Sequence, residues 1–340
     1  MTIQKTLEIL FEGHDLSKTE AKNVFLEVMS GRATEAQIGG LLAALRVKTE
    51  TADEIAGAAE AMRSLSIKVE VDLPNLVDTC GTGGSGKKLF NISTASAFVA
   101  AASGANIAKH GNRKMSSMSG SADILEEAGV KLNLLPDQIS QCIREVGIGF
   151  IFAQTHHSAM KYAAPVRTQI GARTIMNILG PLTNPASAKN QVIGIFDSSW
   201  QTKIAEVLRL LGAHHVLIVH SEGLDEIGLE KPTSIIELKE KIITKYRVTP
   251  SDFGIKAEKH DRLIASSPAE SLKLLKKSLT KPDTAPSNIV SMNAGAAIYA
   301  SGVATSLENG VIMAQDAIAS GLAYEKFNEL VRVTQLMANS

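Results

Sequence analysis

The pattern of hydrophobic and polar positions divides the chain near residue 74. Before that point apolar residues recur at helical spacing, and no alternating strand pattern appears. Ser17–Glu20 and Thr51–Glu54 each predict a helix start, because their hydroxyl and carboxylate groups satisfy the free amides of a first turn. The apolar stretch Gln37–Leu45 contains Gly39-Gly40, where helices can approach closely. The pattern predicts a small helical bundle.

From residue 76 onward, short apolar runs alternate with helical segments. The predicted strands are Leu76–Asp78, Asn106–Lys109, Gly149–Phe152, Val192–Phe196 and Val216–His220. The predicted helices between them are Thr94–Ser103, Ala122–Ala128, Pro136–Val146 and Lys203–Leu211. Alternation of this kind favours a mostly parallel central sheet flanked by helices. We therefore expect an α/β fold, with a small all-helical domain and a larger domain built around that sheet.

Three further segments complete the predicted organisation. Residues 234–239 and 241–247 predict a charged surface hairpin, and roughly the last 50 residues are expected to be helical. Residues 158–180 predict a helical segment that interrupts the α/β region and leads into a Gly-, Pro- and Asn-rich stretch. Such a segment is expected to rejoin the bundle. The predicted domains are a helical one, residues 1–70 with an insertion at about 160–186, and an α/β one, residues 74–159 and 187–340.

Composition narrows the range of partners. Lysine plus arginine and aspartate plus glutamate both number 35, so the formal net charge is zero. A nucleic-acid-binding protein usually carries a basic excess, so no nucleic-acid partner is expected. Cys80 and Cys142 are too few for a disulfide framework and lack metal-site spacing. Because no apolar run reaches about 18 residues and the start does not resemble a signal peptide, we expect no membrane partner and a cytoplasmic location.

A glycine-rich loop is the first candidate site. Asp78–Gly86 follows a predicted strand and precedes a helix that opens at Asn91–Thr94. Glycines lack Cβ atoms, so their amides can surround an anion, and the helix start adds free N–H groups. Asn91, Ser93 and Thr94 can cap this helix or bind phosphate and metal. The loop is neither a Walker motif nor a G-x-G-x-x-G fingerprint, and an ordinary tight turn explains such a cluster equally well.

A second polar loop follows the next predicted strand. Lys109–Ser117 supplies positive charge from Lys109 and Arg113 and hydrogen-bonding groups from Asn112. Ligands of open α/β sheets bind at the carboxyl ends of the strands, so both loops are expected to face one crevice. A solvated basic loop is the usual alternative. The convergence of two polar loops makes a ligand site the favoured interpretation.

Charged residues farther along the chain indicate a site for a metal ion and a site for the carboxylate of a ligand. Asp225-Glu226 follows a predicted strand and suits Mg²⁺, which takes one or two carboxylates plus water and phosphate oxygens. Taken alone, a surface turn is the simpler explanation for this pair. Arg167 has the donors to clamp a carboxylate through two hydrogen bonds. The pairs His156-His157 and His214-His215 lack metal-ligand spacing and predict structural roles.

Together these motifs resemble the anthranilate phosphoribosyltransferase family of tryptophan biosynthesis over nearly the whole chain. The matching stretches are Gly81–Gly84, Phe90–Thr94, Lys109–Arg113, Ser116-Ser117, Gly120–Asp123, Gly180–Pro185 and Gly223–Glu226. The resemblance implies a homodimer formed through the helical domains, with the site between the two domains of each chain. It implies transfer of the phosphoribosyl group of phosphoribosyl pyrophosphate (PRPP) to the amine of anthranilate. Pyrophosphate is released, and two Mg²⁺ ions are implied per site.

The resemblance also implies roles for individual residues. The residues that hold PRPP would be Gly81, Gly83, Gly84, Ser85, Leu89, Asn91, Ile92, Ser93, Thr94, Lys109, His110, Gly111, Asn112, Arg113, Ser116, Ser117 and Ser121. The residues that bind anthranilate or line its route would be Gly81, Asn112, His157, Arg167, Gly180 and Pro181. Ser93, Asp225 and Glu226 would be the magnesium ligands. Lys109 and His110 would be the catalytic groups, His110 as a proton acceptor.

The chemistry of the reaction explains this choice of groups. Breaking the bond between the sugar and pyrophosphate produces a highly charged leaving group, so cations matter more than a strong base. The chain departs from the family pattern at four positions: Ser85 replaces an Asp, Leu89 a Thr, Met118 a Lys and Ser158 a Pro. The alternatives are a pyrimidine nucleoside phosphorylase of the same fold and a non-catalytic nucleic-acid-binding paralogue. The acidic pair opposes both, and the neutral charge also opposes the second.

Overall fold

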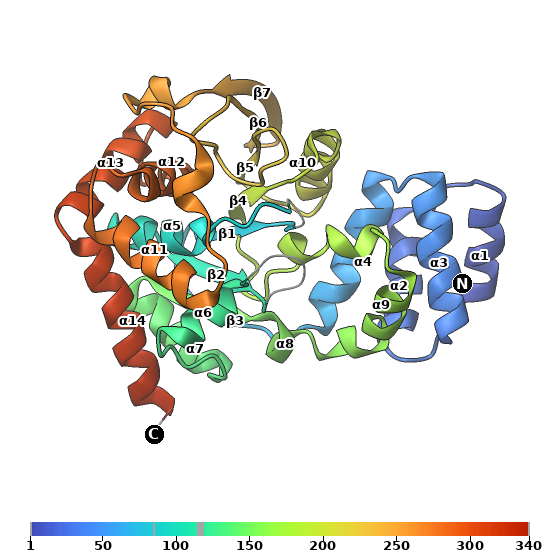
Figure 1. Ribbon diagram of the computed structural model, residues 1–340. Coiled ribbons are helices and arrows are strands. Elements are labelled where there is room, and N and C mark those ends of the chain that lie inside the picture. The colour runs from blue at the N-terminus through green and yellow to red at the C-terminus, as the bar shows by residue number, and fades with distance from the viewer. Residues whose placement is uncertain (1, 84–85, 114–118, 339–340) are drawn as a thin grey trace.

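The computed structural model describes residues 2–83, 86–113 and 119–338. The predicted helical bundle lies at one end of the molecule (Figure 1). Its helices are α1 (Ile3–Phe11), α2 (Lys18–Met29), α3 (Glu35–Lys48) and α4 (Ala52–Leu65). Both predicted capping boxes are formed, between Ser17 and Glu20 and between Thr51 and Glu54. Local sequence therefore determines where α2 and α4 begin.

The larger part of the molecule is built on one sheet with the strand order β3-β2-β1-β4-β5-β6-β7. Strands β1 to β5 pair in parallel, whereas β6 and β7 are antiparallel. The strands are β1 (Val77–Gly81), β2 (Ile107–Gly111), β3 (Ile148–Phe152), β4 (Asn190–Gly194), β5 (His215–His220), β6 (Thr233–Lys239) and β7 (Ile242–Val248). The predicted fold class, a mostly parallel sheet beside a helical unit, is confirmed.

Helices cover both faces of the sheet (Figure 1). They are α5 (Ile92–Ala102), α6 (Ser121–Glu127), α7 (Pro136–Val146), α10 (Gln201–Leu210), α11 (Pro268–Thr280), α12 (Ala285–Ala300), α13 (Leu307–Ala319) and α14 (Leu322–Ala338). Helix α11 was missed, although Ser267 caps it and Pro268 occupies its first turn. The predicted C-terminal helices are present as α12 to α14.

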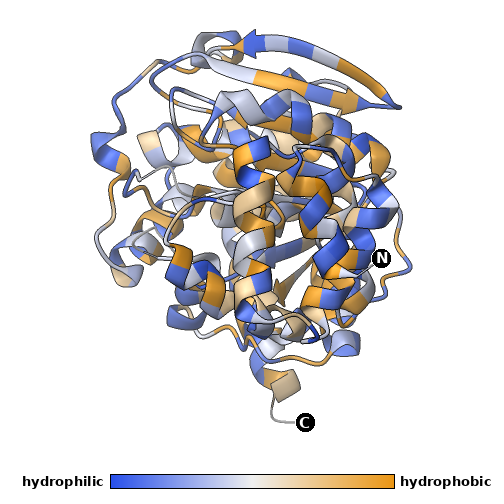
Figure 2. Cartoon of the chain, turned by 90° about the vertical axis from the view of Figure 1, so that its right-hand side faces the viewer, coloured by the Kyte–Doolittle hydropathy of each residue, from blue (hydrophilic) through white to orange (hydrophobic). Residues whose placement is uncertain are grey.

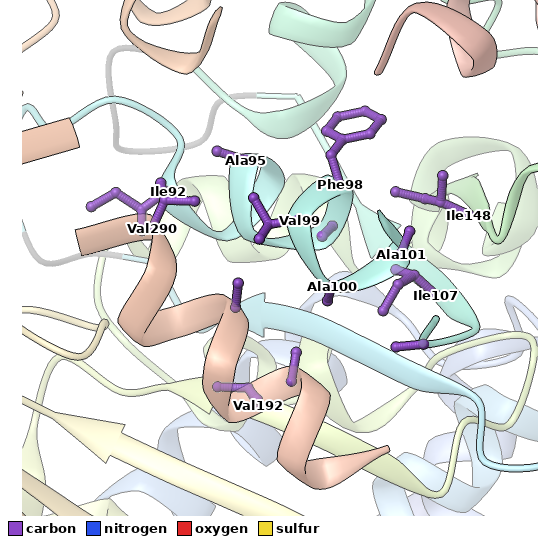
Figure 3. Packing of buried hydrophobic residues seen from close by; sticks show 14 of the residues in the cluster. Ile92, Ala95, Phe98, Val99, Ala100, Ala101, Ile107, Ile148, Val192 and Val290 are labelled. Atoms are coloured by element: carbon purple, nitrogen blue, oxygen red, sulfur yellow. The ribbon is translucent and has the colours of Figure 1, made fainter. Parts of the chain in front are cut away.

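Alternate residues of the central strands belong to two hydrophobic cores. Val192 of β4 belongs to the core beneath α5 and α12, and Figure 3 draws it together with Ile92 of α5 and Val290 of α12, which belong to the same core. The next residue, Ile193, belongs to the core that α10 and the bundle share. Side chains of successive strand residues point to opposite faces, so one strand contributes to both cores. The bundle therefore shares a core with one face of the sheet, and its helix α4 packs on α10, which covers that face.

The predicted surface hairpin is only half at the surface. Its two strands pair as expected, but β6 also pairs with β5 and is largely buried, so it is part of the central sheet. Strand β7 forms the exposed edge, and hydrophilic and hydrophobic residues alternate along this ribbon at the top of Figure 2. The prediction was wrong about β6 because its charged residue Glu237 is buried with bonded partners. Its carboxylate oxygens are 2.8 Å from Nε2 of His215 and 2.9 Å from the Tyr246 hydroxyl.

The segment predicted as one helical insertion is a series of short turns. They are α8 (Ala153–His156), η1 (Ser158–Tyr162), α9 (Ala164–Ile170), η2 (Ile175–Asn177) and η3 (Gly180–Leu182), where η denotes a 3₁₀ helix. Gly171 ends α9 in a left-handed conformation, with a φ of +62°. Helix α9 packs on α3, where a Cβ added to Gly39 would lie 3.7 Å from Val166. Among the described residues, no helix is long and apolar enough to span a membrane.

Candidate active site

A cleft of about 540 Å³ lies at the carboxyl ends of β1, β2 and β4. Both predicted polar loops and the acidic pair contribute to its walls, together with the 167–177 segment. The predicted site residues that line it are Gly81, Gly83, Leu89, Asn91, Ile92, Ser93, Lys109, His110, Gly111, Asn112, Arg113, Ser121, Arg167, Asp225 and Glu226. Gly84, Ser85, Ser116, Ser117 and Met118 lie outside the described residues. Segments far apart in sequence thus meet in one space.

Two glycines allow Asp225 to lie over the ends of β1 and β4. A Cβ added to Gly81 would lie 2.7 Å from Oδ2 of Asp225. A Cβ added to Gly194 would lie only 1.6 Å from the Asp225 carbonyl oxygen. Real Cβ atoms do not approach other atoms so closely, so Gly194, which faces backbone, requires glycine, whereas a side chain at position 81 would displace the Asp225 carboxylate. The absence of these side chains brings the acidic pair next to the glycine loop.

Lys109 places a buried ammonium group at the cleft wall. Its Nζ donates to the Thr79 carbonyl oxygen at 2.5 Å and lies 3.5 Å from Oγ of Ser93. Burial lowers the pKa of Lys109, and the nearby carboxylates of Asp78 and Glu226 oppose that effect. The side chain is only 2% exposed and is held between β1 and α5. A cation fixed in this way can stabilise negative charge in the cleft.

Asp225 and Glu226 form a site that fits a magnesium ion completed by substrate. Burial, followed by the charge of Asp225, raises the pKa of Glu226 to about 8, whereas the backbone amide of Ser93 lowers it by donating a hydrogen bond. A bound divalent cation would relieve this crowding of negative charge. Within the described ranges, no group of three or more His, Cys, Asp or Glu side chains could hold a metal. Mg²⁺ suits such a pair because it retains waters and binds substrate phosphates.

Helix α5 begins without the side-chain cap that Asn91 could have provided. Asn91 occupies the N-cap position, but its side chain makes no capping hydrogen bond. Instead its Oδ1 accepts hydrogen bonds from the hydroxyls of Ser119 and Ser271, both at 2.9 Å. Thr94 is fully buried and does not line the cleft. Of the two roles that the sequence left open for Asn91, capping of α5 is not seen, because tertiary partners from two other segments bind its amide.

Arg113 is bound to carboxylates of α6. Its guanidinium nitrogens lie 2.6 and 2.9 Å from the two oxygens of Glu126, and one lies 3.3 Å from Asp123. It also lies over the Phe152 ring, 5.5 Å from the centroid. Arg113 was predicted to bind PRPP. Its guanidinium is at the edge of the cleft, and in this conformation Glu126 and a ligand phosphate would compete for it.

The opposite wall contains residues that the sequence did not indicate. Arg167 of α9 lines it as predicted, and burial lowers the pKa of its guanidinium. Arg173, Asn177 and Phe196 also line the cleft, and Arg173 lies 3.6 Å from the centroid of the Phe196 ring. Phe196 ends a predicted strand, and a residue in that position is a candidate for ligand contact in an α/β sheet. Nothing local distinguished Arg173 or Asn177.

Two neutral histidines lie behind this wall. The His110 and His157 rings have centroids 5.1 Å apart, and both Nε2 atoms are buried with no hydrogen-bond partner among the described residues. Burial and the neighbouring histidines lower the pKa of His110 well below its usual value, and burial lowers the pKa of His157 to about 4. His157, Gly180 and Pro181 do not line the cleft itself. His110 separates them from it.

Comparison with known proteins agrees with this geometry. Residues 73–324 match the family described as glycosyl transferase family, a/b domain, and residues 4–66 match its helical bundle domain. An anthranilate phosphoribosyltransferase from Marinomonas sp. (strain MWYL1) is 52% identical over 98% of both chains. The corresponding protein of Saccharophagus degradans is 50% identical over 99% of this chain and all of its own. The chain belongs to the anthranilate phosphoribosyltransferase family.

Solved structures of the anthranilate phosphoribosyltransferase family share the whole fold. The enzyme from Thermus thermophilus superposes with a TM-score of 0.92 at 40% identity, covering 97% of this chain and 99% of its own. The Saccharomyces cerevisiae enzyme in complex with PRPP and Mg has a TM-score of 0.89 at 24% identity, covering 98% of each chain. The chain is therefore a pentosyl-transferring glycosyltransferase in its fold and family. The role of each cleft residue stays a prediction.

Proposed function

We propose that this chain transfers the phosphoribosyl group of PRPP to the amine of anthranilate, giving N-(5-phosphoribosyl)anthranilate and pyrophosphate. This is the second step of tryptophan synthesis from chorismate. Full-length relatives with about half of their residues identical support the assignment. The observation that carries it is the meeting of buried Lys109, the Asp225-Glu226 pair and the glycine loop in one cleft. These groups suit a magnesium-bound pyrophosphate better than any neutral ligand.

We call the ends of β1 and β2, the start of α5 and the Asp225-Glu226 pair the phosphoribosyl wall. This wall holds PRPP through backbone amides and a few fixed charges. Gly81 and Gly83 and the amides at the start of α5 face the cleft, where they can donate to phosphate oxygens. Lys109 stabilises the charge that develops on the leaving pyrophosphate. Asn112, Ser121 and the remaining predicted PRPP residues that line the cleft supply hydrogen bonds to the ribose and its phosphate. Thr94 supports α5 from its buried side.

Magnesium is held by Asp225 and Glu226, with Ser93 as a third ligand and two ions per site. The relative from Saccharomyces cerevisiae was solved with PRPP and Mg. The ions supply charge neutralisation on the pyrophosphate. Lys109, 3.5 Å from the Ser93 hydroxyl, adds a protein cation to the same region. The chain's own residues therefore orient the leaving group and stabilise its charge.

We call the opposite wall, lined by Arg167, Arg173, Asn177 and Phe196, the acceptor wall. It holds anthranilate by its carboxylate and its ring. Arg167 binds the carboxylate, and Asn112 and Gly81 contact the acceptor from the other side of the cleft. The pKa of buried His110 lies well below its usual range, so its ring is neutral near neutral pH and can accept the proton of the attacking amine. An aromatic amine is a weak nucleophile. Holding it against the anomeric carbon therefore supplies much of the rate.

Residues 160–186 belong with the helical unit in this proposal. Tyr162 lies over Gly31, and Val166 packs on Gly39, so the segment contacts both α2 and α3. The α/β unit then comprises residues 74–159 and 187–340. Exposed apolar side chains of the bundle, Phe11 at 69% and Val47 at 86%, support a homodimer formed through the helical units. A cytoplasmic location stays a prediction.

The test is turnover by the purified protein. With PRPP, anthranilate and magnesium, anthranilate fluorescence should decay and one pyrophosphate should appear for each anthranilate lost. Chelation of magnesium should abolish both signals. No turnover under these conditions would contradict the proposal. Phosphate-dependent cleavage of a pyrimidine nucleoside would support the phosphorylase alternative, and tight nucleic-acid binding without turnover would support the non-catalytic one.

A further inference from the structure

The turn Gly180–Asn184 lies behind the acceptor wall, and its carbonyl groups are bound by side chains from separate elements. The ring of His110, on β2, lies beside the Gly180 carbonyl and is influenced by it electrostatically. Gln191 of β4 donates to Pro181 at 2.8 Å, and Arg63 of α4 donates to Leu182 at 2.7 Å. Two strands and the bundle therefore meet at this turn.

Asn184 ends the turn and is almost completely buried. Its Nδ2 donates to Oδ2 of Asp78 and to the Ala108 carbonyl oxygen, both at 2.8 Å. Its Oδ1 accepts from the Ala186 amide, also at 2.8 Å. A side-chain amide has two donors and one acceptor oxygen, so every group of Asn184 is used. Its position is fixed from three directions.

Asp78 of β1 joins this turn to the end of β2. Its Oδ1 accepts the backbone amide of His110 at 3.0 Å, while its other oxygen accepts from Asn184. The carboxylate is fully buried, and burial raises its pKa to about 6 despite the attraction of Lys109. A buried carboxylate is costly unless its oxygens are bonded. The two hydrogen bonds and Lys109 offset that cost, so their loss should move the side chain.

We infer that Asp78 and Asn184 are a positioning pair that holds the Gly180-Pro181 turn in register with Lys109 and His110. The inference rests on the proposed function, in which His110 lies beside the acceptor and Lys109 beside the leaving group, with the turn behind His110. Neither Asp78 nor Asn184 lines the cleft, so they act through the residues they hold. The pair couples the acceptor side to the phosphoribosyl side through hydrogen bonds of 2.8 and 3.0 Å.

The first test is Asn184→Ala. The variant removes the donor to Asp78 and frees the turn, and a misplacement of about 1 Å can cost roughly 100-fold in rate. We expect kcat to fall by about 30-fold and the KM for anthranilate to rise. The Kd of PRPP, measured by calorimetry with magnesium, should stay within about threefold, because this wall does not touch the phosphates.

Asn190→Ala is the matched control. Asn190 is also a buried asparagine whose amide bonds a backbone carbonyl, that of Leu76 at 3.3 Å, but it lies at the start of β4, away from the cleft. It should lower thermal stability while leaving kcat unchanged. If both variants lose activity equally, or if Asn184→Ala weakens PRPP as much as anthranilate, the pair has only a structural role and the inference fails.

An exchange of the two residues provides a rescue test that does not depend on Asn184→Ala remaining folded. Asp78→Asn alone places an amide against the Asn184 amide and should lower kcat to a similar degree. The double variant Asp78→Asn/Asn184→Asp restores the bond between the side chains and both backbone amide bonds, but it sets a carboxylate oxygen against the Ala108 carbonyl oxygen in place of a donor. It should recover part of the lost kcat. A double variant as slow as Asp78→Asn would overturn the inference. Wild-type protein that fails to turn over anthranilate would instead contradict the proposed function.

Discussion

The two walls of the cleft are built on different principles. The phosphoribosyl wall consists of strand ends and a helix start, and it places Lys109, Asp225 and Glu226 where parallel strands end together. The acceptor wall comes from short turns, and the Gly180–Asn184 turn behind it is held by distant partners, among them Asp78 and Arg63. Charge is thus fixed by regular secondary structure, whereas acceptor alignment is fixed by tertiary hydrogen bonds. The two walls should respond differently to substitution.

The largest expected effect is on the phosphoribosyl wall. Lys109→Met retains the length of the buried side chain but removes the cation beside Ser93. Loss of a fixed electrostatic group in an enclosed site typically costs about 100- to 1000-fold in rate. We expect kcat/KM for PRPP to fall by roughly 1000-fold, measured from anthranilate fluorescence at varied PRPP.

Lys48→Met is the control for burial of a lysine. The Lys48 side chain is also largely buried, and its Nζ lies 2.5 Å from Asp15 and 3.0 Å from Glu54 in the helical bundle. Breaking such a pair should lower the free energy of unfolding by about 3 kcal/mol while leaving kcat/KM unchanged. Comparable activity losses in the two variants would show that Lys109 supports the fold and that the charged wall is not specialised.

The next effect is on the acceptor wall. Arg167→Ala removes the proposed partner of the anthranilate carboxylate, and a hydrogen bond to a charged group contributes about 1.5–3 kcal/mol. The KM for anthranilate should therefore rise by about 50-fold, with the Kd of PRPP unchanged. Arg209→Ala, at an exposed position of helix α10, should change neither. Equal weakening of both substrates in Arg167→Ala would remove the distinction between the walls.

The sequence predicted the phosphoribosyl wall well because its information is local. A strand, a glycine run and a helix start are adjacent in the chain, and parallel strands bring successive loops to one edge of the sheet. The glycine loop and Lys109 were therefore predicted to face one crevice, whereas only the family resemblance implied that Asp225 joins them. The glycine at Gly194, which admits Asp225, was not recognised, because its requirement arises from a residue 31 positions later, as 225 − 194 = 31.

The acceptor wall was predicted less well because it depends on long-range contacts. The 158–180 segment is broken into short turns at positions such as Gly171, and periodicity does not show which partners hold a turn. Arg173 and Asn177 resemble ordinary surface residues until the fold brings them to the cleft. Asp78 was counted only as part of the glycine loop. Its bond to Asn184 joins residues 106 positions apart, which no local pattern encodes.

The neutral histidines of the acceptor side predict a pH-dependent stability. The pKa of His157 is lowered to about 4 by burial and by the nearby His156 and Lys68, with the His110 ring 5.1 Å away. The unfolded chain binds this proton near pH 6.5, so the stabilisation is complete above that pH and is lost as pH falls towards 4. Between pH 7 and pH 5 this group should account for a loss of about 2 kcal/mol in unfolding free energy.

His157→Asn tests this expectation, because asparagine does not titrate in this range and its amide can donate to the nearby Thr183 carbonyl. The difference in unfolding free energy between about pH 7 and about pH 5, from denaturant titrations, should shrink by about 2 kcal/mol. Parallel pH profiles for the variant and the wild type would show that His157 does not titrate in this range. The acceptor side would then lack the acid sensitivity that its buried histidines imply.

The smallest expected effect concerns Arg113, which was predicted to bind PRPP and is paired with Glu126 in this structure. Its guanidinium makes two hydrogen bonds to Glu126, at 2.6 and 2.9 Å, and this carboxylate is half exposed. Exposed ion pairs are weak, typically below about 1 kcal/mol.

If Arg113 must leave Glu126 to reach a PRPP phosphate, Glu126→Gln should lower the Kd of PRPP by about threefold. Glu127→Gln makes the same change of charge one residue later. It controls for the overall electrostatic effect of removing a negative charge and should change the Kd of PRPP less. Equal effects in the two variants would show that only the overall charge matters. Weaker PRPP binding in Glu126→Gln would mean that Glu126 holds Arg113 in its working position, and this part of the wall would then be as preorganised as Lys109.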